Sequence, residues 1–361
     1  MVSRSFWPAT RGGAERFIAR VAGEAAAMGH EVCVVTGSPV AGKGYRCVIN
    51  PRPSLRARLL PGSFAFDHAA AEAAARLGVE AVVVNAYWSS LTPYFLRRLG
   101  YAGRVAMLVH DVGFLDTMRG PGGAVRRAAL RLSAQAADAV IVPTEGVARR
   151  LVEGVGVEPG KVRVLGFEGV DAPMARLHVD NEWFDVVQVA RFTESKGHLD
   201  LVEAARLLAP RLRRLRVLIA GGVTDPAYYR RVVLAAERLN QQLGRRVVEV
   251  LGEVDDTGSL YRVADVCVAA SRGNEGYGLV VEECMGYGKP VVASDLFAEL
   301  GVVDEEVAYI YPRGDPRALA ERLLEVAENP DAAAEKALRG LERVRGHTWR
   351  RVAEKILEAL A

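Results

Sequence analysis

The sequence lacks the long apolar runs and the strong net charge that would place it at once in a membrane or nucleic-acid-binding class. No apolar stretch approaches the ~18 residues of a membrane span, and the N-terminal MVSRSFWPATRGG contains no signal-peptide core. The net charge is only +3, so a generic nucleic-acid binder is not indicated. Apolar residues at 50% and charged residues at 25% are typical of a globular chain. At 361 residues, the chain is long enough for two domains of about 150 residues each.

Cysteine is also scarce, and the complete set is Cys33, Cys47, Cys267 and Cys284. These residues form neither a CxxC pair nor a metal-ligand spacing, and their neighbours are apolar. We therefore expect four buried, reduced thiols, as in a cytoplasmic protein.

Lysine is rare, and charge is distributed unevenly along the chain. Only six of the 47 basic residues are lysine, so each lysine carries more information than usual. Residues 1–175 hold 21 basic and 14 acidic side chains, whereas the remainder holds 26 and 30. Within residues 40–135 the counts are 13 and 5, so nearly all of the basic excess lies there.

Short β-branched runs alternate with longer helical patterns, which is typical of βαβ units and parallel sheets. The expected strands of the first half are 31–36, 80–84, 104–109, 138–142 and 162–165. After an interruption at 166–183, those of the second half are 184–189, 215–220, 247–251, 265–269 and 290–293. The first helix, with Phe17, Ile18 and Val21 on one face, and the last, with Trp349 and Val352, are amphipathic. The pattern predicts an α/β protein with two doubly wound halves joined near residue 175.

Open parallel sheets bind ligands beyond the carboxyl ends of their strands, so loops after strands are the candidate sites. Gly12 and Gly13 precede the first helix, where a ligand can approach the backbone, although a simple helix-starting turn explains them equally well. Arg191 and Lys196 lie between a strand and a helix start, and two cations at a helix N-terminus favour a phosphate site. Two solvated surface charges are the alternative.

The segment 271–294 combines carboxylates with glycines that leave backbone N–H groups accessible. We expect a helix to begin near Leu279, which places Glu275 in the preceding loop and Glu283 in the helix. Glu275 could accept hydrogen bonds from sugar hydroxyls, and Glu283 could hold a ribose diol. Glu282 points roughly 100° away from Glu283 on a helical wheel, and we expect it to be an exposed charge.

A further candidate is His110, which follows the strand RVAMLV together with Asp111. A single histidine in this position is more often structural than functional, but its place at the carboxyl end of a strand keeps both interpretations open.

These segments together resemble the GT-B glycosyltransferases, specifically glycosyltransferase family 4, whose members are retaining and use nucleotide sugars. EGYGLVVEECMGYGKPVVAS resembles the E-x7-E signature of the family, with Tyr277 for the usual Phe. VARFTESKG resembles its G-R-x-x-x-x-K-G segment, although Ala190 replaces the usual glycine. TRGGAERF, LVHDVG, the GVD at 169–171 and LGEVDDTGSLYRVADVCVAAS match further segments, in the same order along the chain. The first strand is short by comparison, so either the chain starts upstream or the edge of the sheet is reduced.

The resemblance implies two Rossmann-like doubly wound domains that face each other across a cleft. Residues 1–175 would bind the acceptor, residues 176–346 would bind the donor, and a helix at 347–361 would pack back on the first domain. The implied catalytic residues are Glu275, His110, Arg191 and Lys196. The implied donor-binding residues are Gly12, Gly13, Arg191, Lys196, Glu275, Gly276, Tyr277, Gly278, Leu279 and Glu283.

The resemblance also implies a reaction: transfer of a hexosyl group from a UDP- or GDP-sugar to an acceptor hydroxyl with retention of configuration. Arg191 and Lys196 would take the place of a metal, so no metal and no other cofactor is expected, and no Asp-x-Asp occurs in the sequence. The alternatives are a GT-B nucleotide-sugar epimerase and a non-catalytic sugar-nucleotide binder. No nucleic-acid partner is expected.

The acceptor is not identified by these motifs, but two basic amphipathic segments bear on it. Arg52, Arg56 and Arg58 alternate with leucines, and Arg126, Arg127 and Arg131 punctuate an apolar helical pattern. Such segments can rest on anionic lipid or hold an anionic acceptor, or they can simply be solvated helix faces. We expect a cytoplasmic protein, with peripheral contact at the inner face of the membrane as one alternative.

Overall fold

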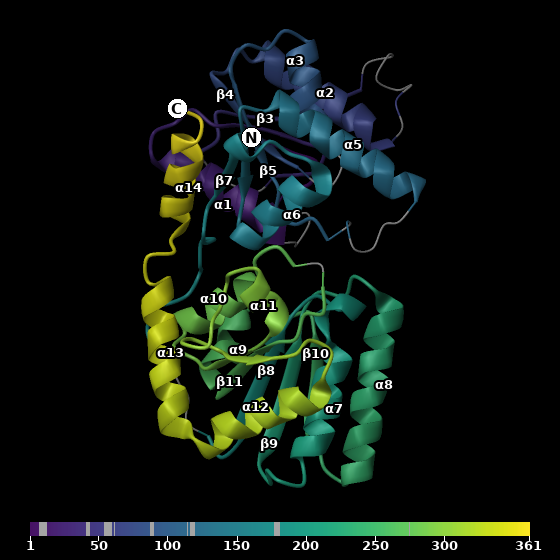
Figure 1. Cartoon of the computed structure of the whole chain (residues 1–361), viewed down its shortest axis with the longest axis vertical. Coiled ribbons are helices and arrows are strands. Elements are labelled where there is room, and N and C mark those ends of the chain that lie inside the picture. The colour runs from purple at the N-terminus through teal and green to yellow at the C-terminus, as the bar shows by residue number, and fades with distance from the viewer. Residues whose placement is uncertain are drawn as a thin grey trace. The chain divides into compact units, whose positions relative to one another are not determined.

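The structure of the chain is a computed structural model that describes residues 1–6, 13–40, 44–53, 60, 62–86, 90–113, 115, 120–176, 181–273 and 275–361. It contains two compact units (Figure 1). Unit 1 comprises Met1–Gly169 and His347–Ala361, and unit 2 comprises Val170–Gly346. The division thus falls after residue 169, earlier than the boundary at 175 that the sequence suggested. Within the described residues, no helix is both long and apolar enough to cross a bilayer.

Unit 1 is built on a parallel sheet whose described strands have the order β3-β2-β1-β4-β5-β6-β7. The strands are β1 (Val2–Ser3), β2 (Cys33–Thr36), β3 (Cys47–Ile49), β4 (Ala81–Asn85), β5 (Arg104–Leu108), β6 (Ala139–Val142) and β7 (Val162–Val164). The short first strand is not at an edge, as one alternative had it. Val2 pairs with Val35 of β2 and with Val84 of β4, so β1 lies inside the sheet.

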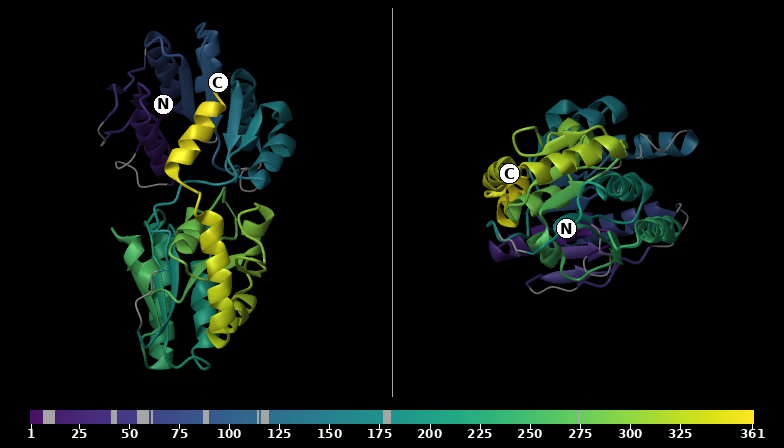
Figure 2. Two further views of the ribbon diagram at one scale, coloured as in Figure 1. Left: turned by 90° about the vertical axis from the view of Figure 1, so that its left-hand side faces the viewer. Right: turned by 90° about the horizontal axis from the view of Figure 1, so that it is seen from below.

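The helices of unit 1 connect these parallel strands. They are α1 (Gly13–Ala27), α2 (Gly62–Arg76), α3 (Thr92–Arg98), α5 (Pro121–Ala136), α6 (Glu145–Val155) and α14 (Trp349–Glu358). The apolar stripe expected for α1 is buried, with Phe17, Ile18 and Val21 at its centre. The C-terminal helix α14 packs against α1 (Figure 2), so the last residues of the chain belong to unit 1.

Unit 2 repeats the same strand order in its own parallel sheet, β10-β9-β8-β11-β12-β13. The strands are β8 (Phe184–Val189), β9 (Leu215–Ala220), β10 (Val248–Gly252), β11 (Val266–Ala269), β12 (Val291–Ser294) and β13 (Tyr309–Tyr311). The helices are α7 (His198–Leu208), α8 (Pro226–Leu243), α9 (Thr257–Val263), α10 (Leu279–Gly286), α11 (Asp295–Glu299), α12 (Pro316–Glu328) and α13 (Pro330–Val344).

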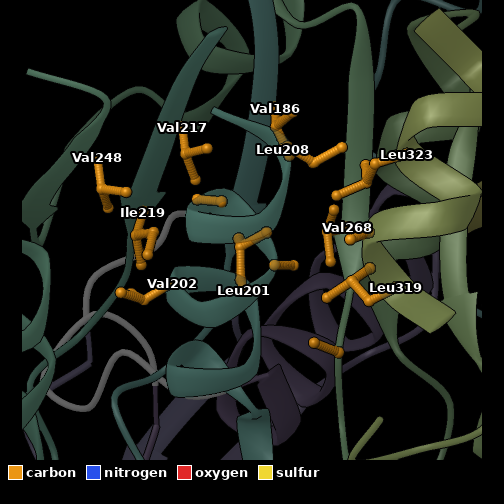
Figure 3. Packing of buried hydrophobic residues seen from close by; sticks show 14 of the residues in the cluster. Val186, Leu201, Val202, Leu208, Val217, Ile219, Val248, Val268, Leu319 and Leu323 are labelled. Atoms are coloured by element: carbon orange, nitrogen blue, oxygen red, sulfur yellow. The ribbon is translucent and has the colours of Figure 1, made fainter. Parts of the chain in front are cut away.

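The core of unit 2 explains why these sequences form strands and helices. Val186, Val217 and Ile219 project from the strands onto Leu201 of α7 and Leu323 of α12, all fully buried (Figure 3). The helical side contributes residues at a period near 3.6 and the strand side contributes residues at a period of 2, as buried faces require. Because α7 is fixed on the sheet in this way, its N-terminus is held at the carboxyl end of β8.

The cysteines do not behave as the sequence suggested, because the four thiols are paired in two disulfides. Cys33 of β2 bonds to Cys47 of β3, and Cys267 of β11 bonds to Cys284 of α10. Cys33 and Cys47 are direct partners in the parallel register of β2 and β3, with Cα atoms 4.6 Å apart. The expectation of four reduced thiols was therefore wrong, since strand register cannot be seen from the spacing of cysteines.

Candidate active site

In each unit, successive strands are first added on one side of the first strand and then on its other side. Counted within each unit, the order begins 3-2-1-4, so the reversal lies between β1 and β4 in unit 1 and between β8 and β11 in unit 2. Ligands of doubly wound sheets bind at such switch points, beyond the carboxyl ends of the strands. The two loops that leave this point in unit 2 are 190–197 and 270–278, which carry the candidate residues from the sequence.

The first loop delivers Lys196 to the start of α7. A 3-10 turn over Glu194–Lys196 is followed by Gly197, whose φ of +66° lets the chain turn into the helix at His198. A side chain at Gly197 would also collide with the carbonyl oxygen of Ala270. Lys196 is buried, and its own carbonyl oxygen accepts a 2.7 Å hydrogen bond from Nε2 of Gln188. Arg191, at the start of the loop, is exposed.

The second loop brings Glu275 to Lys196, 79 positions away in the sequence. Lys196 Nζ donates a hydrogen bond to Glu275 Oε1 and forms an ion pair with it. Ser271 Oγ donates to the same oxygen at 3.1 Å. Two residues that the sequence assigned separately, to phosphate and to sugar, therefore form one charged cluster at the N-terminus of α7.

A second ion pair ties the two loops together. The Arg272 guanidinium donates through Nε to Asp200 of α7 at 2.7 Å and makes a further hydrogen bond through Nη2, and this contact raises the pKa of Arg272. The backbone N–H of Arg272 donates to the carbonyl oxygen of Ser195 at 2.7 Å. This pair was not predicted from the sequence, because Asp200 has the appearance of an ordinary residue in the first turn of a helix. The Arg272–Asp200 ion pair holds the loop 270–278, here called the sugar loop, against the loop 190–197, here called the phosphate loop.

The helix of the E-x7-E segment begins at Leu279, as predicted. Gly278 precedes it with a φ of +95°, and a side chain there would collide with the ring of Phe297. Glu283 is buried, and Oε2 accepts a 3.0 Å hydrogen bond from the hydroxyl of Tyr261. Gly276 and Tyr277 are buried as well, whereas Leu279 is half-buried.

Glu282 differs from the expectation of an exposed charge. Its exposed fraction is 2%, and Oε1 accepts a hydrogen bond from the hydroxyl of Tyr277. The helical wheel failed because α10 packs against α13 as well as against β11 and β12. A residue about 100° from one buried position on such a helix still faces protein.

His198, the first residue of α7, packs against residues of the phosphate loop. It is fully buried, stacks on Phe192 with ring centroids 4.7 Å apart, and its Nε2 lies 3.4 Å from the carbonyl oxygen of Ala190. Burial lowers the pKa of His198 to about 4, although the bond to Ala190 opposes this. The ring is therefore neutral near pH 7 and donates its Nε2 hydrogen to the loop.

In unit 1, His110 lies at the carboxyl end of β5, next to the switch point. Its Nε2 donates to Asn85 Oδ1 at 2.7 Å, and its Nδ1 lies 3.8 Å from Glu168 Oε1. Asn85 Nδ2 in turn donates to Ser3 Oγ at 3.0 Å. Both ring nitrogens thus face side chains of unit 1. Asn85 and Glu168 were not identified from the sequence, where each stands as a single polar residue in an apolar or glycine-rich stretch.

The remaining sequence-predicted residues are placed as follows. Gly13 is the first residue of α1, whereas Gly12 lies outside the described residues. Arg56 and Arg58 of the first basic segment also lie outside them. Within the part of the chain that the structure describes, no group of three His, Cys, Asp or Glu side chains is arranged to hold a metal ion.

Known protein families match both units separately. The family described as "Glycosyltransferase Family 4" matches residues 11–166, and "Glycosyl transferases group 1" matches residues 184–329. The chain is 40% identical over 126 residues to a phosphatidyl-myo-inositol mannosyltransferase from Mycobacterium leprae, a stretch that covers 34% of each protein. It thus spans about a third of that relative's length.

Two longer similarities extend over most of the chain. An alpha-maltose-1-phosphate synthase from Mycolicibacterium smegmatis is 29% identical over 299 residues, which cover 72% of this chain and 75% of the relative. The crystal structure of Anabaena HepE in complex with UDP and glucose superposes with a TM-score of 0.79 and 18% identity, covering 99% of this chain and 98% of the other. The two family matches together leave out only 1–10, 167–183 and 330–361, and the chain belongs to glycosyltransferase family 4, with the GT-B fold.

Proposed function

We propose that the protein transfers a hexosyl group from a nucleoside-diphosphate sugar to an acceptor hydroxyl, with retention of configuration and without a metal ion. The observation that carries this proposal is the Lys196–Glu275 cluster at the N-terminus of α7. A cation for phosphate and a carboxylate for hydroxyls are the two groups that a nucleotide sugar requires side by side.

The diphosphate is bound by Lys196, Arg191 and the N-terminus of α7. The ammonium group, the guanidinium and the positive end of the α7 helix dipole all favour an anion at this point. When the bond between the anomeric carbon and the phosphate oxygen breaks, negative charge grows on the leaving diphosphate, and these groups stabilise it. They supply what a divalent cation would otherwise supply, so we expect activity to persist after dialysis against a chelator.

The sugar and the nucleoside are bound by the second loop and by α10. Glu275 accepts hydrogen bonds from the sugar hydroxyls, and Glu283 accepts them from the ribose diol. The complex of HepE with UDP and glucose supports a donor of this class. We do not propose His110 as a general base, because its two ring nitrogens face Asn85 and Glu168 within unit 1.

Thermal-shift measurements with UDP-glucose, GDP-mannose and ADP-glucose test the donor site. We expect one nucleotide class to raise the melting temperature of the wild type and to have no effect on Lys196→Ala. Arg211→Ala is a matched control, because this cation of unit 2 is exposed and pairs with Glu328 on the surface. Stabilisation by none of the donors, or by the same amount in Lys196→Ala, would overturn the proposal.

We further propose that the acceptor is an anionic lipid and that α5 meets the membrane surface. The relative from M. leprae is named for a phosphatidyl-myo-inositol acceptor. On α5, Val125 and Leu132 are 56% and 44% exposed, large fractions for apolar side chains, and Arg131 beside them is exposed too. Arg127 is half-buried on the same helix. Exposed apolar residues on a helix that also carries arginines are suited to the interface of an anionic bilayer.

Flotation with phosphatidylcholine vesicles, with and without phosphatidylglycerol, tests the membrane surface. We expect the wild type to float only with phosphatidylglycerol at low salt, and the double variant Arg127→Glu/Arg131→Glu to remain in solution. Arg230→Glu/Arg238→Glu, on the exposed side of α8 in unit 2, is the control for net charge. Equal recovery of all three proteins would contradict the role of α5 and leave the donor site unaffected.

A further inference from the structure

The hydrogen bond between Tyr277 and Glu282 has no part in the proposed chemistry, yet it lies inside the E-x7-E segment. We propose that Glu282 is a positioning residue that, through the Tyr277 hydroxyl, holds the main chain of 275–278 in the conformation that binds the sugar of the donor. This inference rests on the proposed function and deepens it. It assigns Glu282 to the sugar part of the donor, whereas its neighbour Glu283 serves the nucleoside part.

The burial of Glu282 requires an explanation of its own. A carboxylate is rarely buried unless it is paired, and leaving water costs it free energy that an aliphatic residue at the same position would not lose. Glu282 is 2% exposed, on a helix that also buries Val281, Cys284 and Met285. The hydrogen bond that it accepts from Tyr277 offsets part of that cost and links the carboxylate to the sugar loop.

The bond spans the junction between the sugar loop and the helix. Tyr277 belongs to the loop and Glu282 to the first turn of α10, so the contact closes over Gly278. Gly278 has a φ of +95°, a conformation that glycine does not enforce by itself, since glycine adopts many others as readily. A side-chain contact across the glycine limits the loop to one conformation and fixes where the N–H groups of Tyr277 and Gly278 point.

The contact is also independent of the donor. Glu275, at the other end of the loop, is held by Lys196 and Ser271, and the donor would compete for the same groups. Tyr277 and Glu282 are both buried, so a ligand does not displace their hydrogen bond. The helix that carries Glu282 is also fixed to the sheet, because Cys284, two positions after Glu282, forms a disulfide with Cys267 of β11.

The neighbouring glutamate provides a matched comparison. Glu283 also accepts a hydrogen bond from a buried tyrosine, Tyr261, which belongs to α9 and not to the sugar loop. Removing one hydroxyl from each pair therefore perturbs two adjacent positions of α10 by the same chemical change. Only Tyr277→Phe removes the hydrogen bond that holds the sugar loop. Tyr261→Phe instead removes the hydrogen bond to Glu283, the carboxylate proposed to bind the nucleoside.

The test compares the binding of UDP and UDP-glucose, or of GDP and GDP-mannose if that pair stabilises the wild type. For Tyr277→Phe we expect unchanged affinity for the free nucleotide and a loss on the order of tenfold for the nucleotide sugar, the effect of one hydrogen bond to a charged group. For Tyr261→Phe we expect both affinities to fall by the same factor. Glu282→Leu should behave as Tyr277→Phe does, and Glu282→Gln, which keeps the accepting oxygen, should recover part of that loss.

The outcomes separate this inference from the proposed function. If the wild type binds a nucleotide sugar but Tyr277→Phe and Glu282→Leu weaken it and the free nucleotide equally, or weaken neither, Glu282 has no positioning role. If the wild type binds none of these nucleotides, the proposed donor site is wrong and the inference fails with it. Melting temperatures of each variant, measured without ligand, show whether the affinities refer to folded protein.

Discussion

Gly197 is a residue at which the two loops of the donor site approach each other closely. Its φ of +66° and the nearby carbonyl oxygen of Ala270 leave no room for a side chain. We expect Gly197→Ala to lower the free energy of unfolding by about 1–3 kcal/mol from the backbone conformation alone, with the steric collision added to it. Gly222→Ala is the control, since a Cβ there meets no atom within 4 Å. Urea unfolding followed by circular dichroism measures the difference, and equal midpoints would contradict the expectation.

His198 gives the donor site a dependence on pH that appears in stability. The pKa in the folded state is about 4 because of burial, whereas the pKa of an unfolded histidine is about 6.5. Between these values the unfolded chain binds the proton and the folded one does not, so stability is complete above pH 6.5 and falls as the pH drops toward 4. The expected loss is about 3 kcal/mol. His198→Gln should lack this slope, and parallel slopes in the two proteins would refute the assignment.

At the residue scale, the sequence predicted which residues belong to the site better than it predicted the burial and the contacts of each side chain. The positions of Lys196 and Glu275 after strands predicted that both would reach one edge of the sheet, and they do form an ion pair. The burial of Glu282 could not be predicted, because it depends on the packing of α13 on α10, and α13 begins 44 positions after the end of α10. Asn85 and Glu168 were missed for the same reason: their common partner, His110, is brought to them only by the sheet.

At the scale of secondary-structure elements, each disulfide joins two elements of the same unit. One joins β2 to β3, and the other joins β11 to the helix that carries Glu282 and Glu283. The sequence separations are 14 and 17 residues, for which loop-closure entropy gives about 3 kcal/mol of stabilisation per bridge. We expect a reducing agent to lower the free energy of unfolding by about that amount for each bond that is opened.

Alkylation of the denatured protein followed by mass spectrometry checks the pairing directly. Without prior reduction we expect no thiol to be labelled, and after reduction all four. The double variants Cys33→Ser/Cys47→Ser and Cys267→Ser/Cys284→Ser separate the two contributions. Labelling of four thiols in the unreduced protein would show that neither bond forms in solution.

The strands themselves were largely predictable from β-branched runs, and all ten expected strands are present within a residue or two of the expected bounds. The strands β3 and β13 were not predicted at all, although β7, which is also three residues long, was. Their place follows from tertiary pairing, in which β3 and β13 each extend one edge of a sheet.

At the scale of the whole molecule, the chain passes from unit 1 to unit 2 after Gly169 and returns after Gly346. The returning segment completes unit 1 through Trp349, which is buried, lies 5.7 Å from the ring of Phe17 between centroids, and fills the space beside Gly169. Unit 1 therefore depends on a helix that is synthesised after all of unit 2. This arrangement predicts that the two units can be destabilised separately.

We expect Trp349→Ala to lower the stability of unit 1 by about 3–5 kcal/mol, the usual cost of truncating a buried aromatic residue. Because the core of unit 2 contains no residue of α14, unit 2 should keep its stability. Hydrogen exchange distinguishes the two, since amides of β4 and β5 should lose protection while those of β8 and β9 do not. Leu338→Ala on α13, where the side chain is 49% exposed, should change neither set. Loss of protection in both sheets after Trp349→Ala would mean that the units unfold together, and the division after Gly169 would then have no thermodynamic meaning.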